Sequence, residues 1–138
     1  MTLDLESLTT SDIATYMHEQ GDRATIADPI PIFYNDVDPT VAANAAAALL
    51  PHTIPAFIET TQHDGCAEFP VTYVVCNNDK ALSVAYQHQA IEVARTREGR
   101  KGGPDGVEVV TLESGHSPFL NKPEEVAEIL RNAAGEAL

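Results

Sequence analysis

The sequence predicts an α/β fold in which a strand–helix–strand–helix unit follows a helical segment. Two β-branched runs, VTYVVC at residues 71–76 and VEVVTL at residues 107–112, have the nearly continuous apolar pattern of strands covered on both faces of a parallel sheet. A helical pattern lies between these runs, and an amphipathic helix follows the second. The part of the chain before the first run lacks such segments. We therefore divide the chain into residues 1–68 and residues 69–138.

Residues 1–68 have the pattern of helices and loops, with no evident strand. A first helix is expected over about residues 10–20, and Gly21 ends it. The stretch ADPIPIFYNDVDP, rich in proline and aspartate, is expected to be extended or turning. An alanine-rich helix is expected over residues 39–50, and a short helix over residues 54–61.

The strand–helix–strand–helix unit contains a helix over about residues 82–97 and a last helix with Pro123 in its first turn. His88 lies on the apolar stripe of the first of these helices, so we expect a packed or hydrogen-bonded histidine there and not a metal ligand. A crossover of this length joins parallel strands, but two parallel strands make no stable sheet. The sheet therefore needs another chain, further polypeptide, or packing from the first half.

Composition excludes several classes of function. The net charge of −13 would repel nucleic acid. No apolar run approaches the ~20 residues of a membrane span, and the first residues lack the pattern of a secretory signal. Cys66 and Cys76 match no zinc or redox spacing, and Cys76 is expected to be a buried thiol. We therefore expect a cytoplasmic protein with no metal and no cofactor.

Two side chains suited to proton transfer follow the two predicted strands. Asp79 comes three residues after the first strand, and His116 comes four residues after the second. Neighbouring parallel strands would bring these loops together, because functional groups of open α/β sheets gather beyond the carboxyl ends of the strands. A carboxylate bonded to one imidazole nitrogen leaves the other free to accept a proton. The sequence thus predicts an acid–histidine pair, with a turn or a helix cap as the alternative role for Asp79.

The segments PVTYVVCNNDKAL and ESGHSPFLNKPEEVAEIL closely resemble the closing part of α/β-hydrolases, over roughly residues 69–136. The upstream stretch FYNDVDPTVAANAAAALLPHTIPAFIETT is similar to the end of the helical cap in small esterases of this family, those related to plant methylesterases and hydroxynitrile lyases. The resemblance implies the C-terminal unit of an α/β-hydrolase sheet behind a cap-like segment. It implies Asp79 as the triad acid, with Asn78 as the fallback, and His116 as the base. It also implies an apolar pocket lined by cap residues, namely Phe33, Tyr34, Ile54 and Phe57.

The sequence departs from the family pattern at the nucleophile. The family's serine lies in Gly-x-Ser-x-Gly on a strand-to-helix elbow, and this sequence contains no such motif and no glycine-rich oxyanion loop. Ser114 and Ser117 flank His116 too closely to act as its nucleophile. Without a nucleophile and oxyanion donors, an acid–histidine pair has nothing to activate.

Three functions are therefore open. The first is hydrolysis of a small apolar or aromatic ester, with the serine supplied by another chain or a missing segment. The second is a non-catalytic remnant that dimerises or holds a small apolar ligand, since bare strand edges favour self-association. The third is an isomerase or lyase step in which His116 alone moves a proton.

Overall fold

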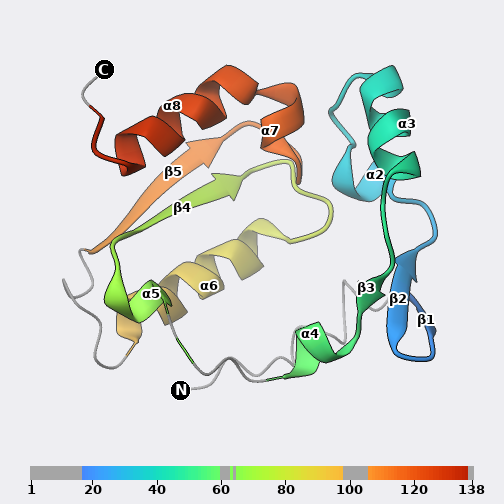
Figure 1. Cartoon of the computed structure of the whole chain (residues 1–138). Coiled ribbons are helices and arrows are strands. Elements are labelled where there is room, and N and C mark those ends of the chain that lie inside the picture. Colours follow the sequence, from blue (N-terminus) through green and yellow to red (C-terminus); the bar gives the residue numbers. More distant parts are fainter. Residues whose placement is uncertain (1–16, 60–62, 64, 98–105, 137–138) are drawn as a thin grey trace.

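The computed structural model describes residues 17–59, 63, 65–97 and 106–136, and it contains one parallel and one antiparallel sheet (Figure 1). In chain order the elements are β1 (Met17–Gln20), β2 (Arg23–Ile26), α2 (Ile30–Phe33), α3 (Pro39–Ala47), β3 (His52–Thr53), α4 (Pro55–Ile58), α5 (Gly65–Glu68), β4 (Val71–Cys76), α6 (Val84–Thr96), β5 (Val107–Leu112), α7 (Pro118–Asn121) and α8 (Pro123–Ala133).

Strands β4 and β5 form the parallel sheet, and both have the bounds that the sequence predicts. They pair in register from Val71 opposite Val107 to Cys76 opposite Leu112. The pairing continues past β4, because Asn77 N donates to Leu112 O at 3.0 Å. Both strands therefore end at the same edge of the sheet, and the loops that follow them start side by side.

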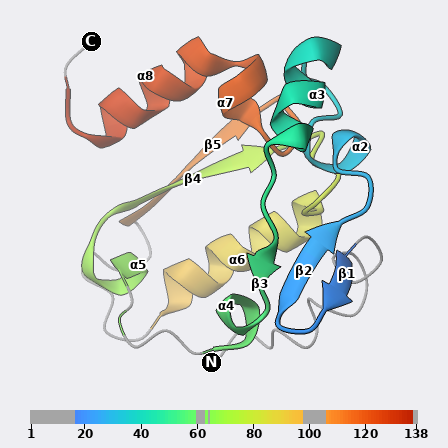
Figure 2. The ribbon, with the colours of Figure 1, turned by 45° about the vertical axis from the view of Figure 1, so that its right-hand side comes forward.

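Helix α6 covers one face of this sheet, with the bounds of the predicted helix shortened slightly at each end (Figures 1 and 2). Ile91 is buried against Val75 and Val107. The expectation for His88 is wrong, because this side chain is exposed and the adjacent Gln87 is buried. The buried stripe of α6 is displaced by one position from the predicted stripe, so Gln87 takes the buried place that was expected for His88.

Helix α8 lies along the opposite face of the sheet, and it starts as predicted with Pro123 in its first turn (Figures 1 and 2). It ends before Gly135, whose φ of 78° suits the left-handed turn that closes many helices. No residue of α8 is buried, and Leu130 on its apolar stripe is 65% exposed. The described chain thus covers one face of the sheet well and leaves the apolar side of α8 open.

The first half of the chain contains strands that the sequence analysis did not expect. Residues 17–20 of the predicted first helix form β1, while the rest of that prediction lies outside the described residues. Strands β1 and β2 form a hairpin, and β3 pairs with β2. Gly21 has a φ of 66° at the first position of the two-residue loop, where a type II′ turn needs glycine. Gly21, which was expected to end a helix, therefore forms the turn of a hairpin.

The proline-rich stretch after β2, which was expected to be extended or turning, contains the one-turn helix α2. Pro31 fits in its first turn, where a backbone N–H has no helical partner. Helix α3 follows as predicted but ends at Ala47, before the exposed Leu49 and Leu50. Asp38 caps α3 by accepting hydrogen bonds from Thr40 N and Val41 N.

The segment between α2 and α3 belongs to a small apolar cluster of its own. Tyr34, Val37 and Ala42 are buried there, and Leu120 of α7 packs against them. The cluster fixes this segment beside the loop that follows β5. None of the described helices is long and apolar enough to cross a membrane.

Candidate active site

The loops after β4 and β5 bring an aspartate and a histidine into contact. His116 Nδ1 lies 3.0 Å from Asp79 Oδ2 and 3.2 Å from Asp79 Oδ1. The Asp79 side chain is 5% exposed, whereas the His116 side chain is 33% exposed. The carboxylate is thus shielded and the imidazole reaches the surface. This contact follows from the parallel register, which ends both strands at one edge.

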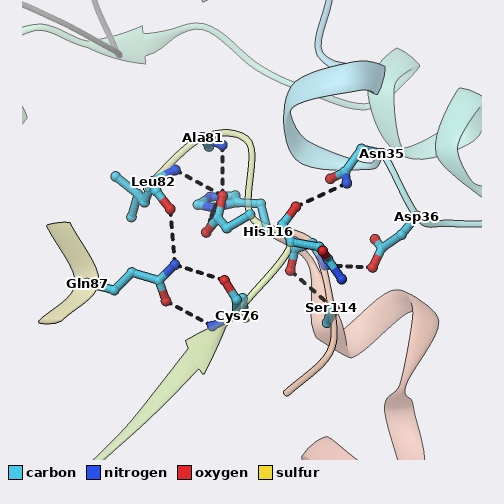
Figure 3. Close-up of polar contacts among 11 residues, drawn as sticks. Asn35, Asp36, Cys76, Ala81, Leu82, Gln87, Ser114 and His116 are labelled. Atoms are coloured by element: carbon cyan, nitrogen blue, oxygen red, sulfur yellow. Dashed lines mark hydrogen bonds and ion pairs between the residues drawn. The ribbon is translucent and has the colours of Figure 1, made fainter. Parts of the chain in front are cut away.

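Asp79 is held by the backbone as well as by the histidine. Its Oδ1 accepts hydrogen bonds from Ala81 N at 2.7 Å and from Leu82 N at 2.9 Å (Figure 3). Burial acts to raise the pKa of this carboxyl, but the hydrogen bonds from His116, Leu82 and Ala81 outweigh it and lower the pKa below the ordinary value. Asp79 is therefore a carboxylate at neutral pH. It orders the turn after β4 and contacts His116 at the same time.

An ionised Asp79 can only accept hydrogen bonds, which determines the tautomer of its partner. Nδ1 of His116 must bear a proton to bond to the carboxylate, so a neutral ring has a lone pair on Nε2. Within the part of the chain that the structure describes, Nε2 makes no hydrogen bond to protein. The ring therefore presents a proton acceptor on its partly exposed side.

Gln87 of α6 fixes the start of the loop that holds Asp79. Its carboxamide accepts from Cys76 N at 2.9 Å and donates to Cys76 O and to Leu82 O, both at 3.0 Å (Figure 3). The side chain is 2% exposed, and these three bonds satisfy backbone groups at the end of β4 and at Leu82, on either side of Asp79. This role was not predicted, because its one sign in the sequence is an uncharged polar residue next to the apolar stripe of α6.

The end of α2 and the segment that follows it lie against the histidine and its loop. The rings of Phe33 and His116 are 5.2 Å apart between centroids, at an angle of 31°. Asn35 Nδ2 donates to Asn78 O at 3.2 Å, and Asp36 Oδ2 accepts from Gly115 N at 2.5 Å (Figure 3). Asn78, the fallback acid, thus contacts this segment through its backbone, and Asp79 is the residue that reaches the histidine.

The other expected pocket residues lie in different surroundings. Tyr34 is buried edge-on to Phe33, at a ring distance of 6.2 Å, and it lines an open cavity of about 540 Å³ together with residues of α2 and α3 and with Lys80. Ile54 is half-buried beside β3, where its N–H bonds to Asp22 O. Phe57 belongs to α4, and its side chain lies outside the described part of the structure. Among the expected pocket residues whose side chains the structure describes, Phe33 is the one in ring contact with His116.

None of the described serines makes a hydrogen bond to His116. Ser114 is fully buried and donates to Asn121 Oδ1 at 2.9 Å, and Ser83 caps α6 through Tyr86 N. Ser117 is buried at the start of α7. Among the described residues there is also no group of three or more His, Cys, Asp or Glu side chains that could hold a metal ion.

Comparison with known proteins gives consistent matches. A sequence model described as "Alpha/beta hydrolase family" matches residues 5–129. The protein named Alpha/beta hydrolase nvfD, from Aspergillus novofumigatus, is 28% identical over 139 aligned positions, which cover 100% of this chain and 52% of that protein. The protein named Probable hydrolase R7, from a Phoma species, is 29% identical over 120 positions, covering 87% of this chain and 45% of that protein. The chain spans about half the length of these curated relatives.

Proposed function

Because the chain belongs to the α/β hydrolase family, we propose that its Asp79–His116 pair acts in ester hydrolysis with a serine nucleophile supplied by other polypeptide. The observation that supports this proposal is the hydrogen-bonded pair itself, with a shielded carboxylate on Nδ1 and Nε2 on the partly exposed side of the ring. A carboxylate–imidazole pair of this kind is the part of a catalytic triad that activates a hydroxyl.

The proposed reaction passes through an acyl-enzyme. Nε2 of His116 accepts the proton of the serine hydroxyl while the serine oxygen bonds to the ester carbonyl carbon. The imidazolium then gives this proton to the leaving alcohol as the ester C–O bond breaks. Water repeats the sequence on the acyl-serine and releases the acid. Asp79 holds the ring in place and stabilises the imidazolium in both halves.

Two features support the view that further polypeptide packs on this chain. The parallel sheet of the described region has two strands, and parallel sheets normally have neighbouring strands and helices on both sides. Phe119 of α7 and Leu130 of α8 are 59% and 65% exposed, and these two helices lie on the side of the parallel sheet opposite α6 (Figure 1). The serine, the oxyanion donors and the cover for these residues would come from the same source.

The proposed substrate is a small apolar or aromatic ester. Phe33 beside His116 would contact the group next to the scissile bond. Tyr34 lines the open cavity nearby, whose walls are mostly apolar side chains of α2, α3 and the segment between them. Residues 1–68 would then act as the cap-like part of the active site, and residues 69–138 would provide the acid and the base. Ile54 and Phe57 stay proposed pocket residues, although Ile54 is not among the residues that line this cavity.

A chimera tests this function directly. The part of the Aspergillus novofumigatus relative that this chain does not cover is joined to this chain, and turnover of p-nitrophenyl butyrate is read together with intact mass after a fluorophosphonate probe. We expect turnover and a labelled serine in the chimera, and neither in this chain alone.

Two histidine variants of the chimera provide the matched comparison. His116→Ala should abolish turnover, whereas His88→Ala should leave it unchanged, because His88 is exposed on α6 and takes no part in the pair. A folded chimera whose His116→Ala variant keeps full turnover would contradict the proposal. A folded chimera with no turnover would contradict it as well. That result would favour the alternative in which the chain binds a small ligand or self-associates without catalysis, and the oligomeric state in solution would then be measured.

A further inference from the structure

We propose that Asn35 and Asp36 are positioning residues that fix the two loops of the acid–histidine pair to the segment between α2 and α3. The inference rests on the proposed function, because it assigns these residues a role in the geometry of that pair. The inference goes beyond the proposed function, because the cap-like segment then holds the acid–histidine pair in place and does not only cover the substrate.

The two residues bind equivalent points of the two loops. Asn35 Nδ2 donates to the carbonyl of Asn78, the residue directly before Asp79. Asp36 Oδ2 accepts from the N–H of Gly115, the residue directly before His116. Consecutive side chains therefore hold the backbone on the N-terminal side of both members of the pair.

Asp36 makes a second contact that extends the same attachment. Its Oδ2 also accepts from Asn121 Nδ2 at 2.7 Å, and Asn121 Oδ1 accepts from the hydroxyl of Ser114 at 2.9 Å. The Asp36 carboxylate thus binds both the loop that contains His116 and the last residue of α7, the helix that follows this loop. Charge-assisted hydrogen bonds of this kind are stronger than those between neutral groups.

The lack of a side chain at Gly115 is an independent sign that this approach is tightly constrained. A Cβ atom at this position would overlap the Oδ1 atoms of Asn35 and Asp36, the latter at 2.6 Å. Glycine is therefore required here for close approach and not for an unusual backbone angle, since its φ is not in the left-handed region. The loop and the segment between α2 and α3 are therefore in close contact at Gly115.

The experiment observes the His116 ring by NMR in this chain without any added nucleophile. Long-range ¹H–¹⁵N spectra report the tautomer of each histidine, and His116→Gln identifies the signals of His116. In the unsubstituted chain we expect a slowly exchanging Nδ1 proton on His116. Asp36→Ala should speed its exchange with water by about tenfold or more, since the loop loses a charge-assisted hydrogen bond.

Two further variants separate a positioning role from general stability. Asp36→Asn should restore slow exchange, because a carboxamide oxygen can accept the same two hydrogen bonds. Asp38→Ala is the matched control, since this aspartate lies two residues further on and caps α3 without contacting the loop. It should lower stability but leave the His116 signal unchanged.

The proposal is overturned if folded Asp36→Ala keeps the exchange rate of the unsubstituted chain within twofold, or if Asp38→Ala changes it equally. If Asp36→Ala does not fold, Asp36→Glu gives the test, because it keeps the charge but moves the acceptor atom; unchanged exchange in this variant also overturns the proposal. The NMR signal requires no serine, so failure of the esterase chimera leaves this result valid, and the reverse also holds.

Discussion

The carboxylate of Asp79 lies 3.0 Å from Nδ1 of His116, although the two residues are 37 positions apart. The contact depends on the parallel pairing of β4 and β5, which ends both strands at the same edge of the sheet. It also depends on the turn after β4, where Ala81 N and Leu82 N orient the carboxylate. The pair is therefore a product of the fold and not of a local sequence motif.

Acid should destabilise the protein through Asp79. The folded state lowers the pKa of this carboxyl below its ordinary value of 3.8, so the folded state binds the proton more weakly than the unfolded state does. The stabilisation is fully present above about pH 4 and is lost as the pH falls through the lower, folded-state pKa. Urea unfolding between pH 7 and pH 2.5 measures this loss. Asp79→Asn should reduce it, and parallel curves for the two proteins would contradict the assignment.

Asp79→Asn should lower kcat of the chimera by on the order of 10³- to 10⁴-fold, with little effect on KM. An amide in place of the carboxylate favours the wrong tautomer of His116 and cannot stabilise the imidazolium. The steady-state rate with p-nitrophenyl butyrate measures the effect. Asp22→Asn is the control, because Asp22 lies exposed in the hairpin turn between β1 and β2. A fall of less than tenfold would mean that Asp79 acts mainly as a turn residue.

Phe33→Ala should cost about 1–2 kcal/mol of unfolding free energy, less than a fully buried phenylalanine would, because Phe33 is half-buried. The substitution removes the ring beside His116 and the edge contact with Tyr34. Urea unfolding at neutral pH gives the value. Phe33→Leu should recover most of the stability but not the ring contact, so KM of the chimera for an aromatic ester should rise in both variants. An unchanged KM would remove Phe33 from the proposed pocket.

Sequence patterns predicted the part of the fold that depends on long, regular elements. The runs of β4 and β5 and the helical periodicity of α6 and α8 are strong local signals. The contact of Asp79 with His116 was predictable too, because parallel neighbours share an edge. The catalytic role of the two residues stays a prediction.

The missed features depend on short elements or on contacts between distant residues. Strands β1 and β2 have four residues each and little alternation of polarity, so Gly21 was read as a helix end. The helical stripe of α6 was misplaced by one position, which put His88 where Gln87 is buried. The contacts of Asn35 and Asp36 span 43 and 79 positions, and no local pattern indicates them.

The two cysteines should differ in reactivity toward a disulfide reagent such as DTNB. Cys66 is exposed in α5, whereas Cys76 is 6% exposed at the end of β4. Burial raises the pKa of the Cys76 thiol, and the negative charges of Asp79 and Asp36 raise it further, so little thiolate is present. We expect one fast thiol and one roughly 100-fold or more slower, since the second reacts only after local opening. Cys66→Ser should remove the fast phase, and equal rates for both thiols would contradict the burial of Cys76.

Gly115→Ala should have the same effect on the His116 loop as Asp36→Ala, by a different route. The added methyl group would overlap the side-chain oxygens of Asn35 and Asp36 and force both away from the loop. We expect a loss of about 1–3 kcal/mol, as for other overpacked sites. The double variant tests whether the two effects share one cause, because each single change breaks the same hydrogen bond from Gly115 N to Asp36. Asp36→Ala with Gly115→Ala should therefore cost clearly less than the sum of the single losses in urea unfolding. Full additivity would mean that the methyl group disturbs the loop without involving Asp36, and the close approach at Gly115 would then need another explanation.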